Sequence, residues 1–339
     1  MKKKLCVLLS TLLFCITLFG CGQGCSSNSN LTFKSDYFSS SVLPPDFKET
    51  LTYTVNYDDG VYYSVSSLID KTAFSFGEGS YVTELSLEAR YPENGEISDD
   101  IDLGNSKIFK YTTTFTMPVT YNSVDYTFDN NNENNFLDII ETETYFCLME
   151  KSFAPLYSKT TVDYTVFSQT ANQKTVSKVK YVSTFKYGAE SCTNVFIQDG
   201  TQTKTESFDY DFGTLIDNTQ LLFAIRNLSV TKNTPVSLPV VSTAYKNQTD
   251  ILVSYIKTEP VSVKLEGQAD ITVNADKLSF SINSTKNSGK EHFVYIQKDG
   301  NYELLQNKAY VVIYVQPLIA YGNFESMGSL EFELINASN

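Results

Sequence analysis

Short segments in which apolar and polar residues alternate recur from residue 49 onward. In Thr50–Tyr57, for example, Leu51, Tyr53 and Val55 fall on one face. A period of two is the pattern of a strand that packs one face on a core, and Thr, Tyr, Phe, Val and Ile, which favour strands, dominate these segments. The chain is therefore predicted to be all-β and mainly antiparallel.

Turn residues separate the segments, and Asp59-Gly60 and Asp299-Gly300 have the composition of hairpin tips. Ile251–Lys257 and Val261–Val273 are predicted as two separate strands. One segment, Asp217–Asn227, breaks the period of two and predicts a single helix of about three turns. Its apolar residues at helical spacing are Leu221, Ile225 and Leu228, and the residues able to cap its start are Asp217 and Thr219.

The amino terminus has the layout of an export signal. Three lysines precede Leu5–Leu18, an apolar stretch of 14 residues that is too short to span a bilayer. This stretch closes on Leu18-Phe19-Gly20-Cys21, which resembles the lipobox of bacterial lipoproteins, although Phe19 stands where a smaller residue is usual. The resemblance implies cleavage after Gly20 and a thioether-linked diacylglycerol on Cys21. An ordinary secreted protein cut nearby is the alternative.

The sequence divides into a signal peptide, residues 1–20, a tether, residues 21–48, and a β-rich body, residues 49–339, which could consist of two halves that meet near residues 200–217. The tether is rich in Ser and Asn, and such a composition predicts a flexible segment with a mean reach of roughly 25–30 Å. Two or three acyl chains would hold the chain on a membrane, because each buried methylene contributes about 0.8 kcal/mol. We therefore expect a lipid-anchored protein on the extracytoplasmic face of the cell membrane.

Charge and composition exclude several classes of function. The chain has 26 basic and 39 acidic residues, and loss of residues 1–20 would change its net charge from −13 to −16. Nucleic acid is not an expected partner, because binding phosphates requires a basic surface. The single histidine, His292, excludes multi-histidine zinc sites and leaves one residue for any catalytic triad.

No catalytic, nucleotide-binding or metal-binding motif stands in the sequence, which is interpreted as that of a non-enzyme without cofactor or metal. His292 is predicted to be an ordinary surface histidine on a strand, and a proton-transfer role is the alternative. Glu141 and Glu143 would share one face of a strand, as a glycoside hydrolase could use. A period of two places carboxylates together by chance in any acidic β-protein, so this pair carries no assignment.

The cysteines leave two readings open. Cys21 would be acylated, and no CxxC pair indicates a redox motif or a zinc ribbon. Cys147 and Cys192 both fall in predicted strands and could form one disulfide in an oxidising exterior. Two buried free thiols are the alternative, because spacing along the chain does not establish proximity.

Several features of the body follow a familiar order. They are the helix sequence Leu221-Leu222-Phe223-Ala224-Ile225-Arg226-Asn227-Leu228, the hairpin Val294–Gly300, the closing strand Gly328-Ser329-Leu330-Glu331-Phe332-Glu333-Leu334 and, earlier, Phe153–Ser158. This order is similar to that of an uncharacterised family of exported bacterial β-proteins grouped with the lipoprotein-carrier (LolA/LolB-like) fold. The resemblance implies a strongly curved, incompletely closed sheet, or half-barrel, with one short helix in its mouth and a cavity for acyl chains. A two-sheet β-sandwich, in which each sheet covers the other, is the alternative.

Two functions follow from this reading. The first is non-catalytic binding of a hydrophobic or lipid-like ligand in the half-barrel of a membrane-anchored lipoprotein. The second is a structural or interaction module of a cell-envelope complex, which would bind a protein partner and no small ligand. The acidic surface and the lack of catalytic motifs favour the second.

Overall fold

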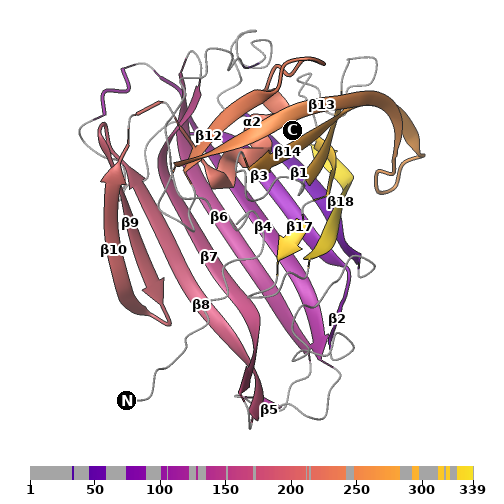
Figure 1. Ribbon diagram of the computed structural model, residues 1–339. Coiled ribbons are helices and arrows are strands. Elements are labelled where there is room, and N and C mark those ends of the chain that lie inside the picture. Colours follow the sequence, from indigo (N-terminus) through magenta and orange to yellow (C-terminus); the bar gives the residue numbers. More distant parts are fainter. Residues whose placement is uncertain are drawn as a thin grey trace.

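The structure is a computed structural model of the 339-residue chain (Figure 1). It describes residues 33, 46–58, 74–88, 101–104, 106–121, 127–128, 135–149, 152–170, 173–210, 212–213, 215–241, 248–282, 292–297, 312–316, 318–320 and 327–338. The predicted signal peptide, Cys21 and the Asp59-Gly60 and Asp299-Gly300 turns lie outside the described residues.

The described residues form one sheet of 18 strands and one short α-helix preceded by a 3-10 turn. The strands are β1 Lys48–Asp58, β2 Phe74–Phe76, β3 Gly79–Glu88, β4 Ile108–Tyr121, β5 Thr127–Phe128, β6 Asn135–Met149, β7 Ser152–Thr170, β8 Gln173–Tyr187, β9 Ser191–Gln198, β10 Thr201–Asp209, β11 Ile216–Asp217, β12 Val236–Val241, β13 Gln248–Val263, β14 Ile271–Ile282, β15 His292–Gln297, β16 Val312–Gln316, β17 Leu318–Ala320 and β18 Met327–Ser338. The helical elements are η2 Asn218–Gln220 and α2 Leu221–Asn227.

Strand pairing confirms the predicted fold class. The long strands pair antiparallel in the order β10, β9, β8, β7, β6, β4, β3, β1, β18, β16, β15, β14, β13 and β12. The short β11 then joins β12 in parallel. One continuous, curled sheet therefore replaces the two stacked sheets of the alternative sandwich.

Bulges interrupt several of the strand pairs. The pairing register shifts in three long pairs: β18 carries the extra residue Ile335 opposite β1, β7 carries Leu156 opposite β6, and β13 carries Ile256 opposite β14. An extra residue on one strand of an antiparallel pair bends that strand and increases its twist. In the folded chain β12–β14 lie over the long strands, and α2 lies beneath this arch (Figure 1).

The core lies on the concave face of the sheet. Along β4, Tyr111, Phe115 and Val119 are buried while their neighbours are half-buried, as the period-two pattern predicts. A single hydrophobic cluster joins these residues to α2 and to side chains of β12–β15 and β18. The middle of the sheet and the strands β12–β15 thus share one core.

One strand prediction is wrong. β13 runs through Thr258–Pro260 to Val263, and the turn comes later, at residues 264–270, where Gly267 has a φ of 72°. Pro260 is tolerated inside the strand because β12 pairs with β13 only as far as Val253, so that at Pro260 β13 has a described partner strand, β14, on one side alone. The predicted strand Val261–Val273 is therefore divided between β13 and β14.

Candidate functional site

The helix α2 fills the space inside the curled sheet. Every residue of Leu221–Asn227 is buried, including Arg226 and Asn227. The sequence predicts one apolar face, whereas the helix is surrounded on all sides. A helix buried all round needs partners for its polar groups from within the fold, and two polar anchors lie at its two ends.

Asp217 forms the first anchor, at the start of η2. Its carboxylate is fully buried and accepts hydrogen bonds from the Ser158 hydroxyl at 2.5 Å, from the Tyr187 hydroxyl, and from the backbone N–H and hydroxyl of Thr219 at 2.8 and 2.6 Å. The Asp217 N–H donates in turn to Gln220 Oε1 at 3.0 Å, which completes a capping box. Prediction of Asp217 as a cap is confirmed.

Uncharged donors surround the Asp217 carboxylate. Burial raises the pKa of Tyr187 well above its ordinary value, and the nearby Asp217 carboxylate raises it further. The same two causes, burial first, raise the pKa of the Cys192 thiol. Both groups therefore stay protonated at neutral pH, and the Tyr187 hydroxyl donates to the carboxylate that caps the start of the helix.

The second anchor is an ion pair at the other end of α2. Arg226 Nη1 lies 2.7 Å from Glu49 Oε1, and both side chains are almost fully buried. The guanidinium also lies over the Phe223 ring at 5.0 Å. The buried phenol Tyr111, on β4, is one of the nearby groups; burial raises its pKa to about 12, and Arg226 offsets part of the rise.

A group of aromatic rings packs against α2. The Phe153 ring lies 5.0 Å from Phe223 of α2 and 6.0 Å from Phe146 of β6, measured between ring centroids. The Phe33 ring meets Phe153 edge-on at 4.4 Å, and the Phe33 backbone pairs with Leu228, directly after α2. An apolar side chain from the segment predicted as a flexible tether is thus held at the end of the helix.

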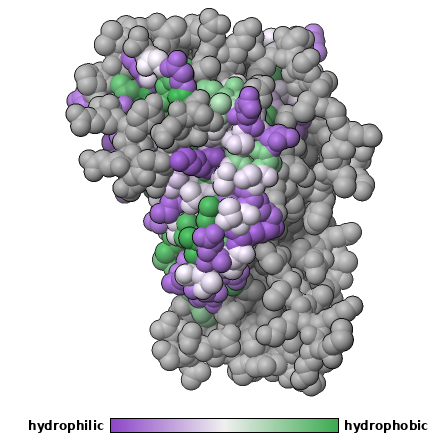
Figure 2. Space-filling model, turned by 90° about the vertical axis from the view of Figure 1, so that its left-hand side faces the viewer, coloured by the Kyte–Doolittle hydropathy of each residue, from purple (hydrophilic) through white to green (hydrophobic). Residues whose placement is uncertain are grey.

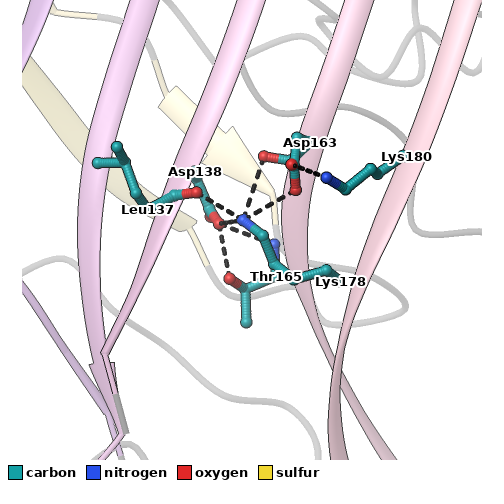
Figure 3. Close-up of polar contacts among 6 residues, drawn as sticks. All are labelled: Leu137, Asp138, Asp163, Thr165, Lys178 and Lys180. Carbon is teal, nitrogen blue, oxygen red and sulfur yellow. Dashed lines mark hydrogen bonds and ion pairs between the residues drawn. The ribbon is translucent and has the colours of Figure 1, made fainter. Parts of the chain in front are cut away.

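A third polar cluster lies between β6, β7 and β8 (Figure 3). Lys178 Nζ lies 3.1 Å from an oxygen of Asp163 and 3.4 Å from one of Asp138, and it donates to the Leu137 carbonyl at 2.5 Å. Lys180 Nζ lies 2.8 Å from the other oxygen of Asp163. Asp138 also accepts hydrogen bonds from the Thr165 N–H and hydroxyl.

The pKa values of the two carboxylates in this cluster shift in opposite directions. Burial raises the pKa of Asp138 and is only partly offset by Thr165 and Lys178. Burial also acts on Asp163, but hydrogen bonds from Lys180 and Lys178 outweigh it and lower the pKa of Asp163. Asp138 binds Lys178 and Thr165, and Asp163 binds Lys178 and Lys180. The cluster therefore links β6, β7 and β8 by ion pairs.

The other predicted candidates are two cysteines and two glutamates. Cys147 and Cys192 are buried free thiols that belong to separate hydrophobic clusters, so no disulfide joins them. Glu141 is exposed, and Glu143 pairs with Lys110 across β4 and β6 at 3.2 Å. Among the described residues, no group of three or more His, Cys, Asp or Glu side chains could hold a metal ion.

The prediction that His292 is a surface residue is wrong. The side chain is buried and stacks on Phe280 at 5.1 Å, and burial lowers its pKa to about 4. Its alternation with the buried Val294 and Ile296 could have placed it on the core face.

No described helix is long and apolar enough to cross a membrane.

Comparisons with known proteins do not assign the chain to a family. No family model and no curated protein matches the sequence. Among solved structures, it is similar to a β-barrel-like protein of a domain of unknown function, DUF1849, from Brucella abortus. The sequence identity is 10%, the TM-score is 0.37, and the match covers 86% of this chain and 96% of that chain.

Proposed function

We propose that the protein is a lipoprotein, anchored through Cys21 on the extracytoplasmic face of the cell membrane, that binds a hydrophobic or lipid-like ligand without catalysis. The observation that supports this function most directly is Phe33. Its ring is held against Phe153 and its backbone against Leu228, at the end of the buried helix. The apolar part of a ligand would take the place of this ring.

The ring contact also limits where the ligand site lies relative to the membrane. Phe33 follows Cys21 by 12 residues, which span at most about 40 Å when fully extended. A diacylglycerol on Cys21 would therefore keep the Leu228 end of α2 within about 40 Å of the bilayer. That distance suits the transfer of a ligand whose acyl chains reside in the membrane.

A photoactivatable, alkyne-tagged fatty acid tests the ligand proposal in cells that express the full chain. We expect crosslinks on the peptides that contain Phe153 and Leu228, and these peptides are distinct from the peptide that carries an acylated Cys21. Phe33→Ala should increase crosslinking several-fold, because the competing ring is gone. Phe293→Ala, on the half-buried face of β15 opposite the core, is the control and should leave crosslinking unchanged. Crosslinks confined to the Cys21 peptide would overturn the ligand proposal.

The anchor is tested separately with Cys21→Ser. We expect the variant to appear in the medium or to accumulate as an unprocessed precursor, since the acceptor for the diacylglycerol is lost. Unchanged retention in membranes together with unchanged processing would contradict lipidation at Cys21. Ligand crosslinking and membrane retention can thus fail independently.

A second function, that of an interaction module in a cell-envelope complex, is favoured by the packing of the interior. The buried α2 and the rings of Phe146, Phe153 and Phe223 occupy the concave face, where a carrier would hold its ligand. Crosslinking in intact membranes followed by purification tests this alternative. Recovery of a stable hetero-complex would support it, and recovery of this chain alone would count against it.

A further inference from the structure

The strand β10 forms one edge of the sheet. It pairs with β9 along one side, and no strand among the described residues pairs with its other side. Thr201–Thr205 are exposed, and so are Ser207 and Asp209. Figure 1 places β10 at the outer edge of the sheet. Figure 2 views the molecule from that side.

Natural proteins protect such edges with charges, prolines or bulges, because an open edge can pair with another chain. β10 contains one lysine, Lys204, and one central carboxylate, Glu206. Lys204 Nζ lies 2.5 Å from Glu206 Oε1 on the same strand. Their charges cancel, so neither deters a neutral or complementary strand. A bulge between Gln202 and Lys204 protects the first part of β10 and leaves Lys204–Asp209 regular.

The sequence of this regular part is complementary to itself. When two copies of β10 run antiparallel about Thr205, Lys204 of one copy lies opposite Glu206 of the other, and the same contact occurs twice. Opposite charges and pairs of threonine across strands are stabilising, whereas like charges directly opposite are destabilising. A centre on Glu206 would instead oppose two glutamates.

We propose that β10 pairs with the β10 of a second copy of this chain, antiparallel and about a two-fold axis through Thr205. The two sheets then continue across the contact, each Lys204 facing the partner's Glu206. Such a contact is isologous and closed, so it forms a dimer rather than a fibre. The large negative charge of each copy does not prevent this contact, because charges farther apart than about 8 Å are largely screened at physiological ionic strength.

Cysteine crosslinking of the full chain in its own membrane tests the register. In a Cys25→Ser background, Thr205→Cys places two thiols opposite each other on the axis. Oxidation should then yield a disulfide-linked dimer on non-reducing gels. Ser207→Cys is the matched control, since its two thiols would lie about 13 Å apart, four residues along the strand, and should crosslink several-fold less. The buried Cys147 and Cys192 are not expected to compete.

Charge reversal in the Thr205→Cys background tests the complementarity. Lys204→Glu opposes two carboxylates at each contact, and Glu206→Lys opposes two ammonium groups, so each should reduce crosslinking about tenfold. The double variant Lys204→Glu/Glu206→Lys restores opposite charges and should recover most of the dimer. Equal crosslinking of Thr205→Cys and Ser207→Cys, absence of the Thr205→Cys dimer, or failure of the double variant to recover it would overturn the proposal.

Discussion

Asp217 and Asp163 are two carboxylates that the protein holds in opposite ways. Asp217 is fully buried and accepts hydrogen bonds from hydroxyl and amide groups. Asp163 retains 27% of its side-chain exposure and lies between the ammonium groups of Lys178 and Lys180. The buried Asp217 carboxylate is thus held by neutral donors, and the half-buried Asp163 carboxylate is held by flexible lysine side chains.

This difference has an energetic reason. Bringing a second charge into a dry interior adds its own desolvation cost, whereas hydroxyl donors already lie on the neighbouring strands. Near water, lysines lose little hydration and make a pair of modest strength. Disruption of the inner centre should therefore cost several times more than disruption of the outer one.

Asp217→Ala should have the largest effect, about 4 kcal/mol of the free energy of unfolding. The substitution removes the cap of η2 and leaves the buried hydroxyls of Ser158 and Tyr187 without their acceptor. Denaturant unfolding followed by circular dichroism measures it. Asp199→Asn is the control, since Asp199 is exposed at a turn with a φ of 50°, where asparagine is tolerated. A loss below about 1 kcal/mol for Asp217→Ala would contradict the anchor role.

Arg226→Met should cost about 3 kcal/mol, because it leaves the buried Glu49 carboxylate without its cation. This ion pair is the exception to the interior's use of neutral donors. The double variant Arg226→Met/Glu49→Leu should lose less stability than Arg226→Met alone, since no isolated charge remains. A double variant as unstable as the sum of the two single variants would show that the pair is not coupled.

Burial of His292 should lower the free energy of unfolding by about 3 kcal/mol when the pH falls from about 6.5 to 4. Burial lowers its pKa to about 4, below the ordinary value of 6.5. Between these two values the unfolded chain binds the proton and the folded chain does not, so the free energy of unfolding falls as pH falls from about 6.5 to 4. The difference in stability between the parent and His292→Leu isolates this contribution from the carboxylates. A difference that stays constant over this range would show that His292 is not held neutral by the fold.

The strands and the helix could be predicted because they depend on local periodicity. The same is true of Asp217, whose place before an apolar helical run marks it as a cap. Its other partners could not be predicted, since Ser158 and Tyr187 are 59 and 30 residues away in the sequence. No local pattern states which strands meet the start of a helix.

Two other surprises have the same physical origin. Glu49 stands directly before the predicted strand Thr50–Tyr57, and nothing in the sequence distinguishes it from a surface acid, although the curled sheet brings it to Arg226. Phe33 lies in a polar segment whose composition predicts a tether, but one aromatic ring is enough to bind where Phe153 offers an apolar surface. Composition averages over such single contacts.

Lys178→Met should have the smallest effect, a loss of about 1 kcal/mol, because the ion pairs that it breaks are half-exposed. The change should also raise the pKa of Asp138 further, since Lys178 now offsets part of the effect of burial. Carboxyl chemical shifts measured against pH would detect this, with Lys180→Met as the control because Lys180 contacts Asp163 from a mostly exposed position. If Lys178→Met were as destabilising as Asp217→Ala, hydration would not explain why the two centres differ.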